Sequence, residues 1–502
     1  MKKQLQELID QSLQTLKSEG VEITIDKNDI KIEYSRDPAH GDFASNIAMI
    51  LAKSCKCSPR ELANKISESL PKSTLIKRTE IAGPGFINFF LNQGSYQSVI
   101  LDILKNGDSY GNSNIGGDEP TLVEFVSANP TGPLHIGHGR GAAYGAAICN
   151  LLKKTGFDVY SEYYVNDSGR QMDILTVSIW LRYLQQYEQE VPFPENAYKG
   201  NYITNIAIDL KDKFERKFLV ECKDIRSIVN KKEDSDKKID KLIKHCISVL
   251  KDENYRLIFE ISLESILLSI KNDLGDFGVE FDNWYSEHSL GKNDAVSKCI
   301  SGLNDKSLVY EQDNAKWFRS SKLGDEKDRV LVRENGQTTY FASDIAYHVS
   351  KFDRGYKKII NIWGADHHGY IERVKASMNA LDYSDDAIKI LLVQFAALFR
   401  GKEKLPMSTR LGEFITLKEL IKEVGKDAAH FFYTMRKNEQ HLDFDLELAK
   451  SQSNDNPVYY IQYAHARICS VFRHMSEKGY SFIKSENLSD LSVLSEPHEI
   501  KL

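Results

Sequence analysis

Residues 128–140 read Ala128-Asn129-Pro130-Thr131-Gly132-Pro133-Leu134-His135-Ile136-Gly137-His138-Gly139-Arg140 and lie between two contrasting segments. The apolar residues 122–126 before them are typical of a buried strand, and residues 137–154 after them have the small side chains of a long helix. A second strand candidate, residues 159–165, follows the helix. The Pro and Gly residues therefore mark the turn of a β-α-β unit, which predicts a parallel sheet with a ligand site at the strand ends.

Two histidines, His135 and His138, stand three residues apart, so both fall on one face of the first helical turn. A helix N-terminus offers free N–H groups and the positive end of the helix dipole to a phosphate. Imidazoles at this place can also hydrogen-bond a phosphoryl group in the transition state. A structural role or metal binding is the alternative, but the position after a strand favours nucleotide chemistry.

The rest of the chain divides into regions that differ in their secondary-structure pattern and in their distribution of charge. Residues 1–110 have the patterns of a small α+β domain and end in a linker rich in Gly, Asn, Ser and Asp. Residues 120–411 continue the strand–helix pattern, and residues 412–502 are mostly helical. Residues 185–256 carry interleaved opposite charges, which favours a solvated helical insertion over an RNA-binding arm. The other elements expected in these regions are a helix at 58–70 and strands at 86–91, 339–341 and 358–363.

Composition narrows the class of protein. The chain has 502 residues and a net charge of −6, so its bulk charge does not hold it on nucleic acid, and any RNA contact needs local basic patches. It contains no run of about eighteen apolar residues, so we expect no membrane span. The seven cysteines are dispersed, which favours reduced thiols in a cytoplasm and gives little support to a structural zinc site.

The sequence His-Ile-Gly-His after a first strand resembles the ATP motif of class I aminoacyl-tRNA synthetases, and residues 123–134 resemble the arginyl version in particular. Further segments resemble the same family in the same order along the chain. Residues 35–44 and 82–88 resemble its N-terminal domain, which in the family contacts the tRNA elbow. Residues 363–370 resemble its second strand end on the ATP side, and residues 456–467 resemble the start of its anticodon-binding helical domain.

This resemblance implies an α/β protein with a Rossmann-like catalytic domain at 120–411, an N-terminal tRNA-contacting domain at 1–110 and an incomplete helical anticodon-binding domain at 412–502. It implies ATP-dependent ligation of L-arginine to tRNA(Arg) through arginyl-adenylate, with transfer to the 2′-hydroxyl of the terminal adenosine. We expect Mg²⁺ to arrive with ATP, held by phosphate oxygens and water. We expect no tightly bound cofactor, no zinc, no membrane partner and a cytoplasmic monomer.

The resemblance also implies roles for individual residues. The arginine-binding set is Glu124, Ser127, Asn129, Tyr340 and Asp344. A guanidinium needs planar carboxylate partners, which suits the acidic members of this set. The alternative for Asp344 is that it caps the helix that follows. The ATP-binding set is His135, Gly137, His138, Gly364, Asp366, His367, Met407 and Ser408. A metal site in which Asp366, His367 and His368 join the two motif histidines is a less favoured alternative.

The second motif of the family, ideally Lys-Met-Ser-Lys-Ser, here reads Pro406-Met407-Ser408-Thr409-Arg410. Both lysines are missing, so another cation must neutralise the leaving pyrophosphate. Arg410 is our choice because its guanidinium is always charged and can clamp two phosphate oxygens, while Lys402 and Lys404 are alternatives. Two rival functions remain at this point, an enzyme of the same superfamily that charges another amino acid and a non-catalytic tRNA-binding paralogue. The intact motif histidines argue against the paralogue.

Overall fold

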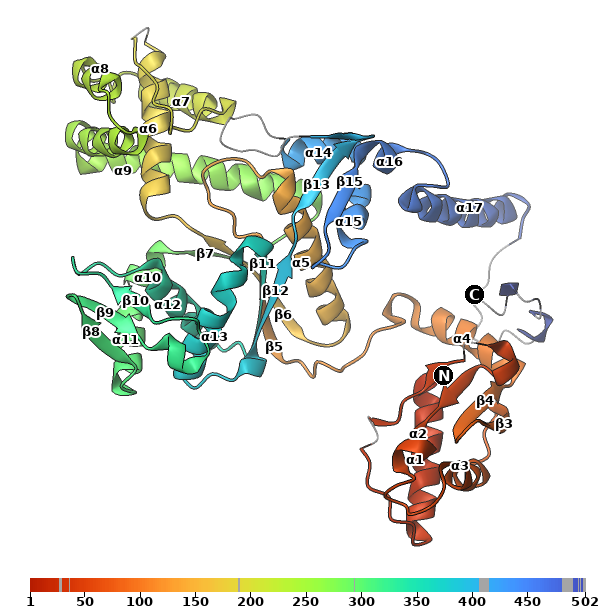
Figure 1. Cartoon of the computed structure of the whole chain (residues 1–502). Coiled ribbons are helices and arrows are strands. Elements are labelled where there is room, and N and C mark those ends of the chain that lie inside the picture. Colours follow the sequence, from red (N-terminus) through yellow and green to blue (C-terminus); the bar gives the residue numbers. More distant parts are fainter. Residues whose placement is uncertain are drawn as a thin grey trace. The chain divides into compact units, whose positions relative to one another are not determined.

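The computed structural model describes residues 1–502 except 27, 28, 36, 188, 189, 293, 406–414, 481–490, 495, 497 and 500–502. The chain forms two compact units (Figure 1). The first comprises Met1–Gly111 and Phe472–Leu502, and the second comprises Asn112–Val471.

The first unit is built on an antiparallel sheet with the strand order β1-β2-β4-β3. Its core is apolar, and α1 contributes to it through Leu5, Ile9 and Leu13, which recur at helical spacing and are buried. The expected helix at 58–70 and strand at 86–91 are confirmed as α3 and β4. The elements are α1 (Lys2–Ser18), β1 (Glu33–Tyr34), β2 (Phe43–Ser45), α2 (Ile47–Leu51), α3 (Pro59–Glu68), β3 (Ile76–Ala82), β4 (Phe86–Leu91) and α4 (Gln93–Asn106), with 3-10 turns at Pro38–His40, Gly107–Ser109 and Leu491–Val493.

A five-stranded parallel sheet organises the second unit, in the order β12-β11-β5-β6-β7 (Figure 1). Helix α5 connects β5 to β6, which confirms the predicted β-α-β unit and the α/β fold class. The expected strand at 358–363 is confirmed as β11. The elements of this layer are β5 (Pro120–Glu124), α5 (Ile136–Lys154), β6 (Asp158–Val165), β7 (Asn283–Ser286), β11 (Lys358–Gly364) and β12 (Ile388–Val393).

Alternate residues of a strand point to opposite sides of the sheet. Both faces of this sheet carry apolar side chains, and helices cover each of them. Val123 of β5 joins the apolar core that α5 and the insertion share, whereas Ile359 of β11 joins a separate core with α12 (Tyr340–Asp353) and α13 (Ile371–Ala380). This two-sided cover is typical of doubly wound parallel sheets. Because β5 pairs in parallel with both β6 and β11, the carboxyl ends of the three strands lie at one edge of the sheet.

A helical insertion lies between β6 and β7 and is more extensive than residues 185–256. It starts at α6, whose residues are buried almost all round, and ends with the long helix α9. In the part of the chain that the structure describes, no helix is both long and apolar enough to cross a membrane. The insertion helices are α6 (Arg170–Gln185), α7 (Asn201–Phe214), α8 (Lys223–Asn230) and α9 (Ser235–Phe277).

Two small three-stranded sheets and several helices complete the chain. The sheets have the orders β10-β9-β8 and β14-β13-β15. The segment after residue 412 is mostly helical, as expected, but it includes β15, which pairs in parallel with β13. The elements are α10 (His288–Lys292), α11 (Ala295–Asp305), β8 (Val309–Gln312), β9 (Ala315–Phe318), β10 (Arg329–Val332), β13 (Ala396–Arg400), β14 (Glu403–Lys404), α14 (Leu417–Val424), α15 (Lys426–Thr434), β15 (Leu442–Asp445), α16 (Leu446–Lys450) and α17 (Pro457–Glu477), with 3-10 turns at Ser320–Leu323, Ala365–Tyr370 and Asp385–Ala387.

Residues 339–341 do not form the expected strand, and this prediction is wrong. Thr339 is the N-cap of α12, and its hydroxyl accepts a hydrogen bond from the Ala342 N–H (3.4 Å). A capping Thr outweighs the weak strand propensity of three residues. Tyr340 and Asp344 consequently lie one turn apart on the same face of a helix. The alternative in which Asp344 caps this helix is also wrong, because Asp344 lies inside it.

Helix α5 packs against β5 through a glycine, which gives a test of the packing. A Cβ at Gly145 would come within 2.2 Å of the Phe125 ring, whereas a Cβ at Gly141 of the same helix would meet nothing within 4 Å. We expect Gly145→Ala to destabilise the protein by about 1–3 kcal/mol, as overpacking does. Gly141→Ala, the matched control, should stabilise it by about 1 kcal/mol through helix propensity. Urea unfolding measures both, and equal effects would contradict the close packing.

Candidate active site

The chain makes an unusual turn directly after β5. Val126 and Ser127 have φ angles of 66° and 41°, and the Ser127 N–H donates a hydrogen bond to the Phe125 carbonyl (2.9 Å). A positive φ is rare for a non-glycine residue and rarer still for a β-branched one. Such conformations cost about 1–3 kcal/mol each and cluster at functional sites, where the surrounding structure holds them.

Side-chain hydrogen bonds hold this turn in place. The Ser127 hydroxyl donates to the Glu124 carboxylate (3.0 Å) and accepts from the Tyr164 N–H (3.1 Å), so it joins β5 to β6. The Tyr163 hydroxyl donates to the Ala128 carbonyl (2.8 Å). The insertion braces the following residues, because the Tyr202 hydroxyl donates to the Thr131 carbonyl (2.8 Å).

The two motif histidines open α5 as a reciprocal capping pair. His135 is the N-cap, and its Nδ1 accepts from the Gly137 N–H (3.0 Å). The His135 N–H in turn donates to Nδ1 of His138 (3.3 Å), and the two rings stack with centroids 3.7 Å apart. Since each Nδ1 is an acceptor, each proton must lie on Nε2.

Both histidines are neutral at physiological pH. Burial lowers the pKa of His135, and burial with the neighbouring His135 lowers the pKa of His138 to about 3. At this helix N-terminus the rings therefore act as fixed Nε2–H donors rather than as cations. Neutral donors aimed at a phosphoryl group stabilise charge that develops there.

The other residues expected on the ATP side lie at the same edge of the sheet. Gly364 ends β11, which pairs with β5, and Asp366 and His367 are exposed in the 3-10 turn that follows. Met407, Ser408 and Arg410 lie outside the described residues. The chain returns from that segment beside the motif, because the Ile136 N–H donates to the Ile415 carbonyl (3.2 Å) and the Leu417 N–H to the Leu134 carbonyl (2.8 Å).

A metal centre has no structural support within the described ranges. No three His, Cys, Asp or Glu side chains of that part of the chain converge as metal ligands. This holds also for the alternative metal site, in which Asp366, His367 and His368 would join the two motif histidines.

Two carboxylates, Asp344 of α12 and Glu287 directly after β7, lie close enough to interact, and we call this pair the acidic pocket. Burial, followed by the negative charges of Glu124 and Glu287, raises the pKa of Asp344 to about 7. Burial also raises the pKa of Glu287, which follows β7. Neither carboxylate forms an ion pair with a residue that the structure describes. Lys351 and Arg373 offset the shift of Asp344 only in part, so two neighbouring carboxylates without an ion-pair partner among the described residues form a site that favours a positively charged ligand.

Glu287 was not among the expected residues. The sequence nevertheless contains a clue to its role. The strand–helix pattern resumes near Trp284, and a carboxylate directly after a strand, as Glu287 is, lies where ligand-binding residues of parallel sheets lie. Tyr340, the other expected residue on α12, is 57% exposed and lies against the start of α6, where a Cβ on Gly169 would be 3.0 Å from its hydroxyl.

Glu124 is engaged differently from the two pocket carboxylates. Its Oε2 forms an ion pair with Nζ of Lys351 (2.6 Å), a fully buried lysine on α12. Lys351 also donates to Asn361 (2.9 Å), whose amide donates to the His348 ring (2.8 Å), and His348 donates to the Asp344 carbonyl (2.7 Å). Oε2 of Glu124 is thus paired inside the protein, while its other carboxylate oxygen accepts from the Ser127 hydroxyl.

Asn129 meets another asparagine at the end of β6. The side-chain amides of Asn129 and Asn166 are within hydrogen-bond distance (3.2 Å). In the amide orientation that satisfies its neighbours, Asn166 donates to Oε2 of Glu287 (2.7 Å). Polar side chains therefore connect the motif turn to the acidic pocket.

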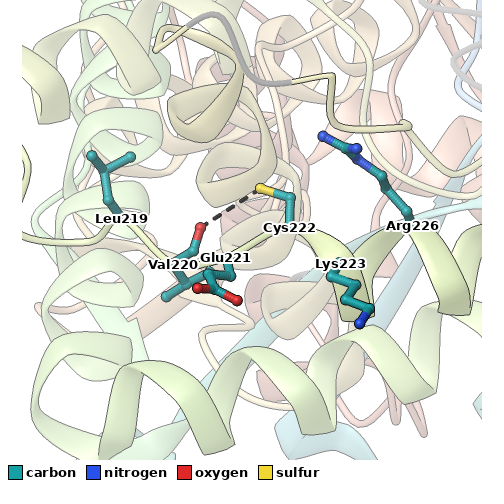
Figure 2. A pocket seen from close by; sticks show the side chains of 6 residues that line it. All are labelled: Leu219, Val220, Glu221, Cys222, Lys223 and Arg226. Atoms are coloured by element: carbon teal, nitrogen blue, oxygen red, sulfur yellow. Dashed lines mark hydrogen bonds between the residues drawn. The ribbon is translucent and has the colours of Figure 1, made fainter.

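The described part of this unit contains a cleft beside the motif turn and a hollow within the insertion. A cleft of about 780 Å³ is lined by the motif turn, including Asn129, His135 and His138, and by the insertion, including Tyr198 and Tyr202. The other hollow, of about 680 Å³, lies in the insertion around Leu219, Val220, Glu221, Cys222, Lys223 and Arg226 (Figure 2). Burial raises the pKa of the Cys222 thiol, whose Sγ faces the Val220 carbonyl (3.7 Å), so this second hollow has no activated nucleophile.

Comparison with known proteins identifies the family of this chain. Residues 3–91 match a family model described as the arginyl tRNA synthetase N terminal domain, and residues 99–454 match tRNA synthetases class I (R), catalytic domain. A curated arginine–tRNA ligase of Thioalkalivibrio sulfidiphilus is 54% identical over 99% of this chain and 86% of its own length. One of Coxiella burnetii is 51% identical over 100% of this chain and 86% of its own length.

Among solved structures, the arginyl-tRNA synthetase of Thermus thermophilus has a TM-score of 0.71 with 20% sequence identity. The match covers 100% of this chain and 85% of that chain. At this identity the likeness shows the fold alone.

The buried ion pair between Glu124 and Lys351 gives a testable prediction. Lys351→Met should destabilise the protein by about 3–5 kcal/mol, because it leaves a buried carboxylate without its partner. The double variant Glu124→Gln/Lys351→Met should be less destabilised than Lys351→Met alone. Urea unfolding of the single and double variants forms a double-mutant cycle. Strictly additive effects would mean that the two side chains do not depend on each other.

Proposed function

The chain belongs to the arginyl-tRNA synthetase family, and from this premise we propose which of its residues bind each substrate. As a member of that family it ligates L-arginine to tRNA in protein synthesis, using ATP and an arginyl-adenylate intermediate. The residue roles that follow are our proposal.

Asp344 and Glu287 receive the guanidinium of arginine. The observation that carries this assignment is that Glu287 is buried and Asp344 partly buried, and that both carry raised pKa values and lack an ion-pair partner among the described residues. A guanidinium placed between them would supply the missing charge and hydrogen bonds in a bidentate geometry. Tyr340 borders the same pocket from α12. Glu124 belongs to the same arginine-binding set, with its Oε2 held in place by Lys351.

Asn129 binds the α-amino end of arginine, since it lies on the motif turn between the pocket and α5. Ser127 contributes by fixing the turn, because its hydroxyl is engaged with Glu124 and the Tyr164 N–H. The strained backbone at Val126 is consistent with a turn held in position for a substrate.

His135, Gly137 and His138 bind the phosphates of ATP at the N-terminus of α5, while Gly364, Asp366 and His367 approach its ribose and adenine. The Nε2–H groups of the two histidines would donate to the α-phosphate as the arginine carboxylate attacks it. No covalent nucleophile on the enzyme is needed, because positioning and charge stabilisation account for such a reaction.

Met407, Ser408 and Arg410 complete the ATP site, with Arg410 as the cation on the departing pyrophosphate. What supports this role is that Ile415, five residues after Arg410, pairs with the motif next to His135. Mg²⁺ bound to phosphate oxygens and water fits the site, because the described residues there offer no cluster of carboxylates or histidines for a protein cage.

The remaining expectations also stand as proposals. The arginyl group goes to the 2′-hydroxyl of the terminal adenosine of tRNA(Arg). Residues 1–110 contact the tRNA, residues 120–411 form the catalytic domain, and residues 412–502 take part in anticodon binding. The enzyme acts as a cytoplasmic monomer without zinc.

Arginine binding should depend on pH through Asp344. Its carboxyl, with a pKa of about 7 in the free enzyme, must ionise to pair with the guanidinium, and Lys351 and Arg373 only partly offset the burial. Binding should be full above pH 7 and weaken as pH falls, by up to about tenfold per pH unit. Calorimetric titration of arginine between pH 8 and pH 5.5 measures this.

Substitution provides the control for the same prediction. Asp344→Asn should raise the arginine KM at least tenfold, since a charge-assisted hydrogen bond is worth about 1.5–3 kcal/mol, and should flatten the pH dependence. Asp353→Asn, at the exposed end of the same helix, should leave both unchanged. A normal arginine KM in Asp344→Asn would exclude this carboxylate from the pocket.

Arg410→Ala tests the cation on the pyrophosphate. We expect the activation rate, measured by arginine-dependent pyrophosphate exchange with tRNA present, to fall at least tenfold, equivalent to about 1.4 kcal/mol. Arginine binding should be nearly unchanged, because the cation acts mainly in the transition state. Lys402→Ala and Lys404→Ala are the parallel controls. If a lysine variant loses activity while Arg410→Ala retains it, the role belongs to that lysine.

A further inference from the structure

The three residues that follow β6, Asn166, Asp167 and Ser168, are all polar, and all three engage the end of β7. Asn166 donates to Oε2 of Glu287 (2.7 Å) in the orientation that satisfies its neighbours. The Ser168 hydroxyl also hydrogen-bonds the Glu287 carboxylate. Together with the Tyr164 hydroxyl of β6, three side chains thus hold the same carboxylate directly.

Asp167 holds the residues on either side of Glu287. One of its carboxylate oxygens accepts from the Ser286 hydroxyl (2.5 Å), and the other accepts from the His288 N–H (3.0 Å). The Glu287 N–H itself donates to the Val165 carbonyl (3.0 Å). Each residue of this β7 end is therefore tied to the end of β6.

The position of β7 explains why such a tie is needed. β7 is four residues long and lies at the edge of the sheet, so only β6 supports it by backbone pairing. Its Glu287 carboxylate is buried near Asp344 without an ion-pair partner among the described residues, and two like charges favour moving apart toward water. An anchor is required to keep Glu287 in the pocket while no substrate is bound.

We propose that Asp167 is the positioning residue that fixes Glu287 in the arginine pocket, acting through Ser286 and His288. It touches no substrate, and Asn166 and Ser168 complete the cradle by bonding the carboxylate itself. This inference rests on the assignment of Glu287 to the guanidinium. Its consequence is that arginine recognition depends on a residue at the base of the helical insertion, outside the motif turn and outside α12.

The test is the steady-state kinetics of the full chain with tRNA, ATP and arginine. Asp167→Asn preserves shape but removes the charge that holds both donors. We expect the arginine KM to rise at least tenfold, with kcat at saturating arginine within about twofold and the KM for ATP unchanged. Ser286→Ala removes the hydroxyl that donates to Asp167, so it should also raise the arginine KM.

Asp282→Asn is the matched control. Asp282 ties the same two strands further from the site, where its Oδ2 accepts from both the N–H and the hydroxyl of Ser161 (2.7 Å each). This variant should lose stability by an amount comparable to Asp167→Asn but keep the arginine KM. A similar rise in arginine KM for Asp282→Asn would mean that general loosening of the strands explains the effect, and would overturn the proposal.

Glu287→Gln separates the proposal from its premise. If Glu287→Gln leaves the arginine KM unchanged, the assignment of Glu287 to the guanidinium fails, and the positioning role fails with it. If Glu287→Gln raises the KM but Asp167→Asn and Ser286→Ala do not, only the positioning role is overturned. In the Glu287→Gln background, Asp167→Asn should add less than about twofold, because it acts through that carboxylate. Should Asp167→Asn fail to fold, Ser286→Ala in the same cycle decides.

Discussion

A buried ion pair between Glu124 and Lys351 fixes the helix that carries one wall of the acidic pocket. Two charges removed from water are tolerable only together, so this pair sets the distance between β5 and α12. From Lys351 the hydrogen bonds continue through Asn361 and His348 to the Asp344 carbonyl. The backbone at Asp344 is thereby determined from the centre of the sheet.

The same sheet edge supports two halves with opposite electrostatic character. On the motif side, His135 and His138 are neutral donors locked by the hydrogen bonds at their Nδ1 atoms. On the pocket side, Asp344 and Glu287 are carboxylates without an ion-pair partner in the described part of the chain. Hydrogen-bond donors on one side and carboxylate acceptors on the other match the binding that we propose for the phosphates of ATP and the guanidinium of arginine.

Much of this could be predicted from local sequence. The turn at 128–140 and the strands beside it follow from side-chain periodicity and from Pro and Gly, which act over a few residues. The predicted strand at 339–341 failed because one capping hydroxyl, that of Thr339, decided the local structure. The partners of Glu124 and Glu287 could not be found in this way, since Lys351 lies 227 residues after Glu124, and Asp167 lies 121 residues before His288. Only the pairing of strands brings such residues together.

The insertion leaves the sheet at β6 and returns at β7, its immediate neighbour. The hydrogen bonds from Ser286 and His288 to Asp167 hold the two ends of the insertion together. For the sheet, the insertion is therefore equivalent to a loop that connects two adjacent strands. The entropy of closing a loop grows only with the logarithm of its length, by about 0.6 kcal/mol for each doubling. Helices between Arg170 and Phe277 could therefore change in length during evolution with little effect on strand register, as long as the ties of Asp167 and Ser168 at the base and the hydrogen bond from Tyr202 to the motif turn are kept.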